Sequence, residues 1–344
     1  TYLRGDGTWA TPAGGGGAGL AGVASIAALR AASVSGYAAG DPIIVRGYYA
    51  DADGGGGLFL WNATSTATDD GGTIIKPSAV GTGAGRWIRF LQGDAALNIR
   101  WFGAKGDGTS DDTAALQAWF AAVLATGLPG YLDKGTFRVT GTSLVWDLNA
   151  LGAFANRGGI IRGAGGWRSV IDVSACTGSP QFELRAASAS MAAFYWSFEA
   201  FGISTRAAIG CQFGRPSAVG LDAPPDAFNS GTLDVVVTNA YAGTATGAVF
   251  NGWYNSDVTA VVNCAAVTRG TAVELNYTSF CRGRWAVGHA QYGIRLGRYV
   301  FGNTFTACDF EVLQTTITTT ADGNASRNSF AGPVSYTHLR AHET

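Results

Sequence analysis

The 344-residue chain is short of charge, of paired cysteines and of long apolar runs, and each shortage excludes a class of protein. Only 14% of the residues are charged, and the net charge of −1 provides no basic surface for nucleic acid. The five cysteines form no Cys-x-x-Cys pair, so we predict buried core thiols rather than a zinc site or a disulfide framework. No apolar run approaches the ~18 residues that a membrane-spanning helix needs.

Glycine, by contrast, is abundant, with 51 residues. Roughly twice the average usage of glycine, together with much alanine, serine and threonine, predicts a β-rich body with many tight turns. The nine prolines and the absence of a glycine at every third position exclude collagen. The chain begins at Thr1 rather than at methionine and shows no signal peptide, so we interpret it as a fragment at its N-terminus.

One amphipathic helix is predicted over residues 111–126. Ser110, Asp111 and Asp112 offer N-cap oxygens and negative charge, which a helix N-terminus favours. Gly127 supplies the C-terminal stop, and a proline follows two residues later. The apolar stripe consists of Leu116, Phe120, Val123 and Leu124.

Beyond residue 130 the chain alternates short apolar strands with glycine and Asn/Asp turns, and residues of the same type recur every 25 positions. These residues are Leu233 and Val258, and then Phe280, Phe305 and Phe330. Asn303 and Asn328 recur at the same interval and predict a side-chain ladder. A unit of this length suits one coil of a parallel β-helix, in which stacked coils bury a continuous apolar row. The alternative is a β-sandwich with regular strand spacing.

The stretch before the helix carries a second recognisable pattern. Strands are predicted near residues 43–45, 58–61, 73–75 and 86–90, separated by glycine turns. Residues 13–22 are rich in glycine and alanine and are typical of a flexible linker.

These patterns resemble a known family. The run Phe102-Gly103-Ala104-Lys105-Gly106-Asp107-Gly108, followed by the acidic cap and Ala-Ala-Leu-Gln, resembles the opening of the pectate-lyase-like β-helix domains of phage tail spikes and polygalacturonase-related enzymes. Residues 1–12 are similar to a segment of tail-fibre proteins, and residues 23–97 to the segment that precedes the β-helix. The resemblance implies an all-β protein, a right-handed single-stranded parallel β-helix with an N-terminal capping helix and a small β neck.

The expected domains follow from this resemblance. Residues 1–22 form a fibre-like segment and linker, residues 23–97 the neck, and residues 98–333 the β-helix. Residues 334–344 look like the translation of a sequencing adapter, so we leave them out of fold reasoning.

The function implied by the resemblance is that of a virion tail protein. Such proteins are homotrimers that bind a bacterial surface polysaccharide, contact other tail or baseplate proteins, and often depolymerise the polysaccharide by hydrolysis or elimination. Nucleic-acid binding, membrane insertion and a cofactor or metal are not expected. Two alternatives stay open, a non-enzymatic adhesin or structural fibre of the same fold and a secreted bacterial pectate-degrading enzyme.

Three acidic residues are the candidate catalytic groups. Asp309 and Glu311 lie at i and i+2 of one predicted strand, so both point outward from the same coil with Phe310 inward. Asp257 is an isolated acid in the repeat region, and solvated outer-face residues are the alternative interpretation of all three. The polygalacturonase motifs are matched only in part, at 255–257 and 288–290, and the Asp-Asp pair between them is missing, so that hydrolytic set is not transferable.

Overall fold

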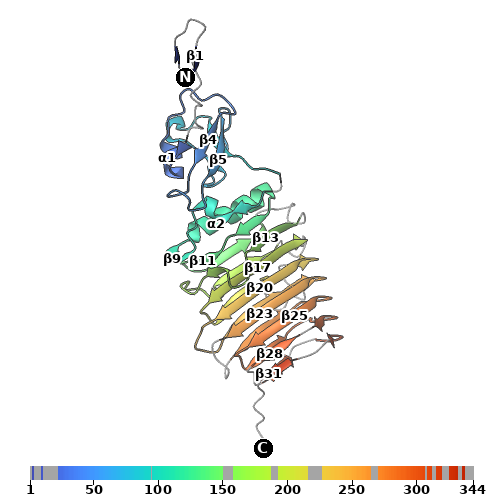
Figure 1. Cartoon of the computed structure of the whole chain (residues 1–344). Helices are drawn as coiled ribbons and strands as arrows, with labels where there is room; N and C mark the ends of the chain where they lie inside the picture. The colour runs from blue at the N-terminus through green and yellow to red at the C-terminus, as the bar shows by residue number, and fades with distance from the viewer. Residues whose placement is uncertain are drawn as a thin grey trace, which may run out of the picture. The chain divides into compact units, whose positions relative to one another are not determined.

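The computed structural model describes residues 2–3, 9–10, 22–93, 95–149, 158–186, 193–215, 227–264, 270–306, 308–311, 315–319, 325–331 and 335–337. The chain divides into two compact units (Figure 1). The neck unit comprises residues 1–93 and 100–103, and the β-helix unit comprises residues 94–99 and 104–344.

The neck unit is built on a five-stranded sheet of order β3-β4-β5-β7-β6, antiparallel except for the β3–β4 pair. Its elements are β1 (Tyr2–Leu3), β2 (Trp9–Ala10), β3 (Gly22–Val23), α1 (Ile26–Ala31), β4 (Pro42–Val45), β5 (Gly57–Asn62), β6 (Ile74–Ile75), η1 (Ser78–Val80) and β7 (Arg86–Arg89). Strands β4 to β7 fall where the sequence predicts strands. The core contains Leu29, Ile43, Phe59 and Trp87. The predicted linker at residues 13–22 lies outside the described residues, except for Gly22.

A buried arginine, Arg89, holds glycine turns of the neck together. Arg89 is 4% exposed and donates to the carbonyl oxygens of Gly55, Gly56 and Gly72 at 2.9, 2.6 and 2.9 Å. Its guanidinium also lies 4.6 Å from the ring centroid of Phe59. A guanidinium presents several donors in a fixed plane, which lets one side chain satisfy carbonyl groups from separate turns.

The β-helix unit consists of short strands that follow one another around successive coils (Figure 1). Its elements are β8 (Leu97–Asn98), η2 (Ile99–Phe102), which crosses from the neck unit, β9 (Asp107–Asp111), α2 (Thr113–Thr126), β10 (Gly130–Leu132), β11 (Gly135–Arg138), β12 (Leu144–Asp147), β13 (Gly159–Gly163), β14 (Ser169–Asp172), β15 (Phe182–Arg185), β16 (Ala193–Phe194), β17 (Trp196–Thr205), β18 (Ile209–Phe213), β19 (Phe228–Asn229), β20 (Thr232–Asn239), β21 (Thr246–Asn251), β22 (Trp253–Tyr254), β23 (Asp257–Cys264), β24 (Thr271–Asn276), β25 (Arg282–Gly288), β26 (Tyr292–Leu296), β27 (Thr304–Thr306), β28 (Asp309–Glu311), β29 (Thr315–Thr319), β30 (Ser329–Ala331) and β31 (Ser335–Thr337).

These strands form three parallel sheets, which are the faces of the β-helix. Among the described residues, fourteen strands, β17, β20, β23 and β25 among them, belong to the main sheet. Seven strands from β12 to β29 form a second sheet, and β16, β19 and β22 form a third. All pairs between coils are parallel, as the resemblance implies. The adapter-like segment predicted at 334–344 contributes β31, which pairs with β28, while residues 338–344 lie outside the described residues.

The register shows that coil length varies. Equivalent residues in successive coils of the main sheet are Ser197, Thr232, Asp257, Arg282, Thr304 and Ser329, so the coils are 35, 25, 25, 22 and 25 residues long. Leu233 pairs with Val258 and Phe305 with Phe330, as their spacing predicts. The prediction that Phe280 belongs to the same row is wrong. Because the coil between Arg282 and Thr304 is three residues shorter, Gly283 is the partner of Phe305.

Instead, Phe280 belongs to a column of left-handed corner residues, which we call the corner column. Each member precedes a strand of the main sheet and donates its backbone N–H to the next coil, at 3.0–3.2 Å in the five pairs from Tyr195 to Gly302. The members are Tyr195, Ser230, Asn255, Phe280, Gly302 and Arg327, with φ between 49° and 63°. The left-handed conformation turns the chain sharply, so every coil reaches the main sheet from the same direction.

Helix α2 confirms the predicted capping helix, and it packs against the core of the β-helix unit. Leu116, Trp119 and Phe120 are buried, and the Phe120 ring stacks on Trp146 at 5.0 Å between centroids. The helix ends at Gly127, which has φ 70°. The Asp112 side chain does not cap the helix but accepts hydrogen bonds from the backbone N–H groups of Lys105 and Gly106 at 2.7 and 2.9 Å.

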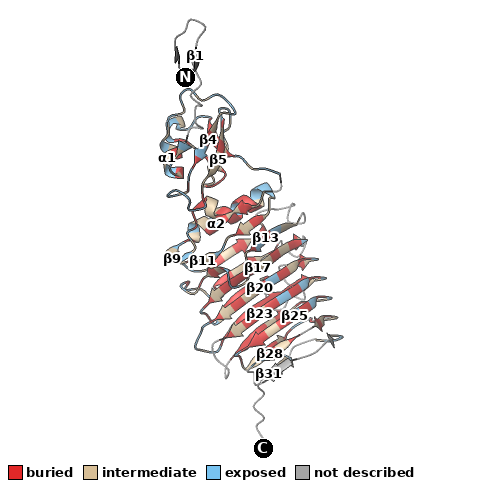
Figure 2. Ribbon diagram, viewed as in Figure 1, coloured by how far each residue is buried: buried red, intermediate tan, exposed pale blue. Residues whose placement is uncertain are grey.

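Burial alternates along the strands of the main sheet, so that every second side chain enters the core (Figure 2). All five cysteines are buried and unpaired, as predicted. The asparagine ladder is also present, because Asn303 Nδ2 donates to Asn328 Oδ1 at 3.1 Å and to the carbonyl oxygen of Thr278 at 2.9 Å. Inward apolar rows and asparagine hydrogen bonds thus fix which residues of each coil face outward.

Candidate functional site

The outer face of the main sheet carries two parallel rows of polar side chains. The register aligns residues from β17, β20, β23 and β25, and alternation turns them away from the core. The first row consists of Ser197, Thr232, Asp257 and Arg282. The second row consists of Glu199, Asp234, Thr259 and Arg284. Members of one row are about 4.8 Å apart from coil to coil, and the rows are separated by two residues along each strand.

Glu199 and Asp234 are direct neighbours in the second row and form a carboxyl pair. They are register partners on adjacent coils. The Ser197 hydroxyl donates to the Glu199 carboxylate. Displacement of water by surrounding protein atoms, and next the Glu199 charge, raises the pKa of Asp234 above its usual range. Two carboxyl groups that face the same side of the sheet are what acid–base chemistry on a sugar requires.

A β-bulge lies directly beside this pair. The register between β17 and β20 shifts between Glu199 and Phe201, and the intervening Ala200 has φ 58°. Phe201 is 1% exposed and returns the strand to its inward–outward alternation. The bulge therefore separates the second row from the outward positions that follow it, and bulges of this kind re-aim neighbouring side chains.

Of the predicted acids, Asp257 lies in the first row and is engaged in an ion pair. Its two carboxylate oxygens accept hydrogen bonds from Nε and Nη2 of Arg282 at 2.8 and 3.1 Å. Both side chains are exposed, at 55% and 75%. A carboxylate whose two oxygens are both held by one guanidinium suits a positioning role.

Asp309 and Glu311 lie together further along the β-helix. The burial of β28 places Phe310 in the core and the two acids outward, as the alternation predicts. Asp309 Oδ1 is buried and has no hydrogen-bond partner among the described residues. Two coils and four strand positions separate Asp309 from Asp257, or about 16 Å. The structure brings two of the three predicted acids together and places the third elsewhere.

Sequence reasoning missed Glu199 as the partner of Asp234. The signal that could have found it is a repeated polar–apolar–polar triplet at the start of each long strand. The triplets are Ser197-Phe198-Glu199, Thr232-Leu233-Asp234, Asp257-Val258-Thr259 and Arg282-Gly283-Arg284. The first two are 35 residues apart, so a search at a fixed 25-residue interval passes over Glu199.

Among the described residues, the His289 side chain makes no hydrogen bond to the Glu199–Asp234 pair or to the carboxyl groups of Asp309 and Glu311. It is exposed, with φ 57°, and lies in the turn that follows β25. Its backbone N–H donates to the carbonyl oxygen of Glu311 at 3.2 Å. The structure therefore places His289 at a coil turn.

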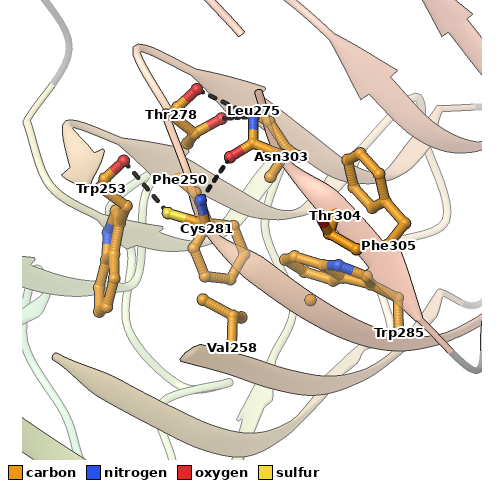
Figure 3. A pocket seen from close by; sticks show the side chains of 11 residues that line it. Phe250, Trp253, Val258, Leu275, Thr278, Cys281, Trp285, Asn303, Thr304 and Phe305 are labelled. Atoms are coloured by element: carbon orange, nitrogen blue, oxygen red, sulfur yellow. Dashed lines mark hydrogen bonds between the residues drawn. The ribbon is translucent and has the colours of Figure 1, made fainter. Parts of the chain in front are cut away.

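Figure 3 shows a small gap between the coils around Trp285. It has a volume of about 20 Å³ and is lined by apolar side chains such as Phe250, Trp253 and Leu275. The polar groups at its edge bond to one another, because Asn303 contacts Thr278 and the backbone of Cys281. A space of this size admits a water molecule and not a sugar ring.

The part of the chain that the structure describes contains no group of three or more His, Cys, Asp or Glu residues able to hold a metal ion. In the Asp51–Gly57 turn, where acidic residues invite a calcium interpretation, Asp53 accepts backbone N–H groups at 2.7–3.1 Å. Within the same described ranges, no helix is long and apolar enough to span a bilayer.

Comparisons with known proteins agree with this architecture. Residues 22–92 match the family described as the phage tail protein small four-stranded beta-sheet domain. Over the whole chain, the fold is similar to the enzymatically active domain of tailspike protein 2 of bacteriophage CBA120, with 16% identity and a TM-score of 0.51 over 91% of this chain and 53% of that one. The full-length tailspike protein 2 of an Escherichia coli O157:H7 bacteriophage aligns at 16% identity and a TM-score of 0.48, over 91% and 47%.

The chain thus spans about half the length of these solved structures. A search of the curated proteins found no match. The first structural alignment supports the shared parallel β-helix fold, and the family match shows that residues 22–92 are similar to a phage tail β domain.

Proposed function

We propose that this protein is part of a phage tail spike that binds a bacterial surface polysaccharide and hydrolyses it on the outer face of the main sheet. The observation that carries the proposal is the Glu199–Asp234 pair, two outward carboxyl groups on adjacent coils. The phage tail match of residues 22–92 and the tailspike-like fold support a virion tail location.

Each carboxyl group has a distinct role in the proposed reaction. Asp234, whose pKa is raised, gives its proton to the glycosidic oxygen as the bond to the anomeric carbon breaks. Glu199, held by the Ser197 hydroxyl, attacks the anomeric carbon as a carboxylate. Water then displaces Glu199 while Asp234 takes back the proton. Neighbouring strands are about 4.8 Å apart, and two carboxyl groups at about that separation would favour this double displacement, which retains the anomeric configuration.

The test measures release of oligosaccharide from purified lipopolysaccharides and capsular polysaccharides. We expect Asp234→Asn and Glu199→Gln each to lower the turnover rate about 10²- to 10⁴-fold with binding retained. Asp257→Asn is the matched control, since Asp257 lies one coil away with its carboxylate already paired to Arg282, and its effect is smaller. Full activity in both pair variants would refute this assignment.

The same assay tests the second pair of acids. Asp309 and Glu311 stay our alternative catalytic pair, supported by their shared outward face and by the unpartnered Asp309 Oδ1. Loss of turnover in Asp309→Ala and Glu311→Ala, with the Glu199 and Asp234 variants fully active, would move the reaction there. An ultraviolet-absorbing product would indicate elimination instead of hydrolysis. Binding without any release would identify a non-enzymatic adhesin.

We further propose that the protein assembles as a homotrimer and contacts other tail or baseplate proteins through its N-terminal region. The phage tail match of residues 22–92 supports the second part of this proposal. Light scattering of the purified chain measures the trimer directly, and a monomeric mass would contradict it.

A further inference from the structure

The loop between β13 and β14 extends over the main sheet beside the second row. It consists of residues 164–168, which we call the β13–β14 loop. The N–H of Gly165 donates to the carbonyl oxygen of Ala200, the bulge residue that follows Glu199, at 2.8 Å. At the other end of the loop, the carbonyl oxygen of Arg168 accepts from Gly135 at 2.7 Å. The loop thus leaves its own coil, reaches the coil that carries Glu199, and returns.

Internal hydrogen bonds hold this loop in one conformation. The N–H groups of Arg168 and Ser169 both donate to the carbonyl oxygen of Gly165, at 2.9 and 3.0 Å. The Ser169 hydroxyl accepts from Ala164 at 2.8 Å and donates to the carbonyl oxygen of Leu132 at 2.9 Å, and Ser169 is fully buried. The backbone at the tip of such a loop is in place before any ligand arrives.

Two glycines allow the loop to lie directly on the sheet. A Cβ atom added to Gly202 would be 2.2 Å from the carbonyl oxygen of Gly166. A Cβ atom added to Gly166 would be 2.4 Å from Cγ2 of Val236. Gly202 and Val236 are register partners on the outer face, and Val236 follows Asp234 by two residues on that face. The loop therefore forms a wall next to the Glu199–Asp234 pair, about 7 Å away along the strands.

Trp167 is at the tip of this wall, and its side chain is 66% exposed. Exposing most of an indole forgoes the stabilisation that burial of so large an apolar surface provides. Nothing in the packing of the loop requires a tryptophan, since the hydrogen bonds that fix it come from backbone groups and Ser169. The flat, apolar face of an exposed indole, on a loop whose backbone lies next to the carboxyl pair, suits one face of a pyranose ring, on which the C–H groups gather.

We propose that Trp167 is the stacking platform for a pyranose ring of the polysaccharide, adjacent to the bond that the Glu199–Asp234 pair cleaves. The inference rests on the proposed function and adds a binding residue outside the carboxyl pair. Trp167 then contributes through the aromatic face alone, so phenylalanine should replace it largely and alanine should not. Replacing Trp167 with alanine should change the Michaelis constant and the dissociation constant more than the turnover number.

The experiment measures dissociation constants against an array of purified bacterial lipopolysaccharide O-chains and capsular polysaccharides. We expect Trp167→Ala to weaken binding of the recognised polysaccharide about tenfold, and Trp167→Phe to stay within about threefold. Phe90→Ala is the control, because Phe90 is an aromatic residue of the neck unit that is 45% exposed. We expect the Phe90→Ala variant to bind the polysaccharide as tightly as the unmodified protein. Unaltered thermal unfolding midpoints exclude a folding defect, as expected for an exposed side chain.

Each outcome decides the matter. If the unmodified protein binds a polysaccharide and Trp167→Ala binds it equally well, the stacking role is wrong while the proposed function stands. If Trp167→Ala and Phe90→Ala lose affinity equally, the effect is not specific and the inference is also overturned. If the unmodified protein binds none of the polysaccharides on the array, the proposed function fails and takes this inference with it.

Discussion

Replacing Arg89 with lysine should remove most of the free energy of unfolding of the neck unit. The Arg89 guanidinium donates to three backbone carbonyl oxygens at 2.6–2.9 Å and lies 4.6 Å from the ring centroids of both Phe59 and Trp101. Burial lowers the pKa of Arg89 to about 9, so the group is still charged at neutral pH. Lysine keeps the charge but replaces a planar fork by a single ammonium.

The expected loss follows from the hydrogen bonds that lysine cannot make. One ammonium reaches one of the carbonyl groups of Gly55, Gly56 and Gly72 well, which leaves two buried acceptors unpaired at about 1–3 kcal/mol each. We expect Arg89→Lys to lower the free energy of unfolding by about 3–5 kcal/mol. A unit of this size is stable by roughly 4–10 kcal/mol in total, so the variant retains little stability.

The assay is a urea titration in which amide hydrogen exchange is measured in β5 and β7. Exchange in these two strands reports on the neck unit separately from the β-helix unit. Arg46→Lys is the control, because Arg46 and Asp51 form an exposed ion pair with side chains 57% and 59% accessible. Its unfolding free energy should change by less than about 0.5 kcal/mol. Equal midpoints for the two variants would refute the role given to the buried guanidinium.

Two further predictions concern the stability of each unit. Trp146→Ala should lower the stability of the β-helix unit by about 3–5 kcal/mol in thermal unfolding, because Trp146 is fully buried and links α2 to the inward rows, whereas exposed Trp167→Ala should not. In the neck unit, desolvation by itself would raise the pKa values of Asp53 and Asp69. Hydrogen bonds outweigh desolvation and hold both pKa values below the usual range. For Asp53 the donors are backbone N–H groups, and for Asp69 they are Arg30 and backbone N–H groups. The contribution of these two carboxylates to stability is present above about pH 4 and is lost as the pH falls through the folded-state values, so acid should unfold the neck, and Asp53→Asn should flatten that dependence in a pH titration of β5 exchange.

Much of the fold is readable from local chemistry. The acidic residues before Thr113 and the stop at Gly127 predict α2 to within two residues, because negative charge favours a helix N-terminus and a glycine stop acts over one turn. Leu233 and Val258 predict a register pair because the coil that joins them has no insertion. Asn303 and Asn328 predict a ladder because a buried amide needs a partner at the same position in the next coil.

The corner position of Phe280 and the carboxyl pair could not be predicted, because they depend on coil lengths that no short segment of sequence reveals. Phe280 has the right spacing for the inward row, yet the following coil is three residues shorter, so the same interval ends at a corner. Glu199 meets Asp234 only because a 35-residue coil returns the chain to the same face. Coil length is set by the turns and loops, and their lengths carry no periodic signal, so the carboxyl pair is visible only once the strands are aligned.

The corner column has an evolutionary consequence. Because Ser230 and Asn255 hold the same left-handed turn in consecutive coils, the backbone enters and leaves a coil in the same direction. Residues 231–255 therefore make up one whole coil. If they were deleted, Thr259 would take the place of Asp234 as the register partner of Glu199, and the strands of the main sheet would still pair. The scaffold can gain or lose whole coils at little structural cost, whereas a site shared by two coils disappears in one such event.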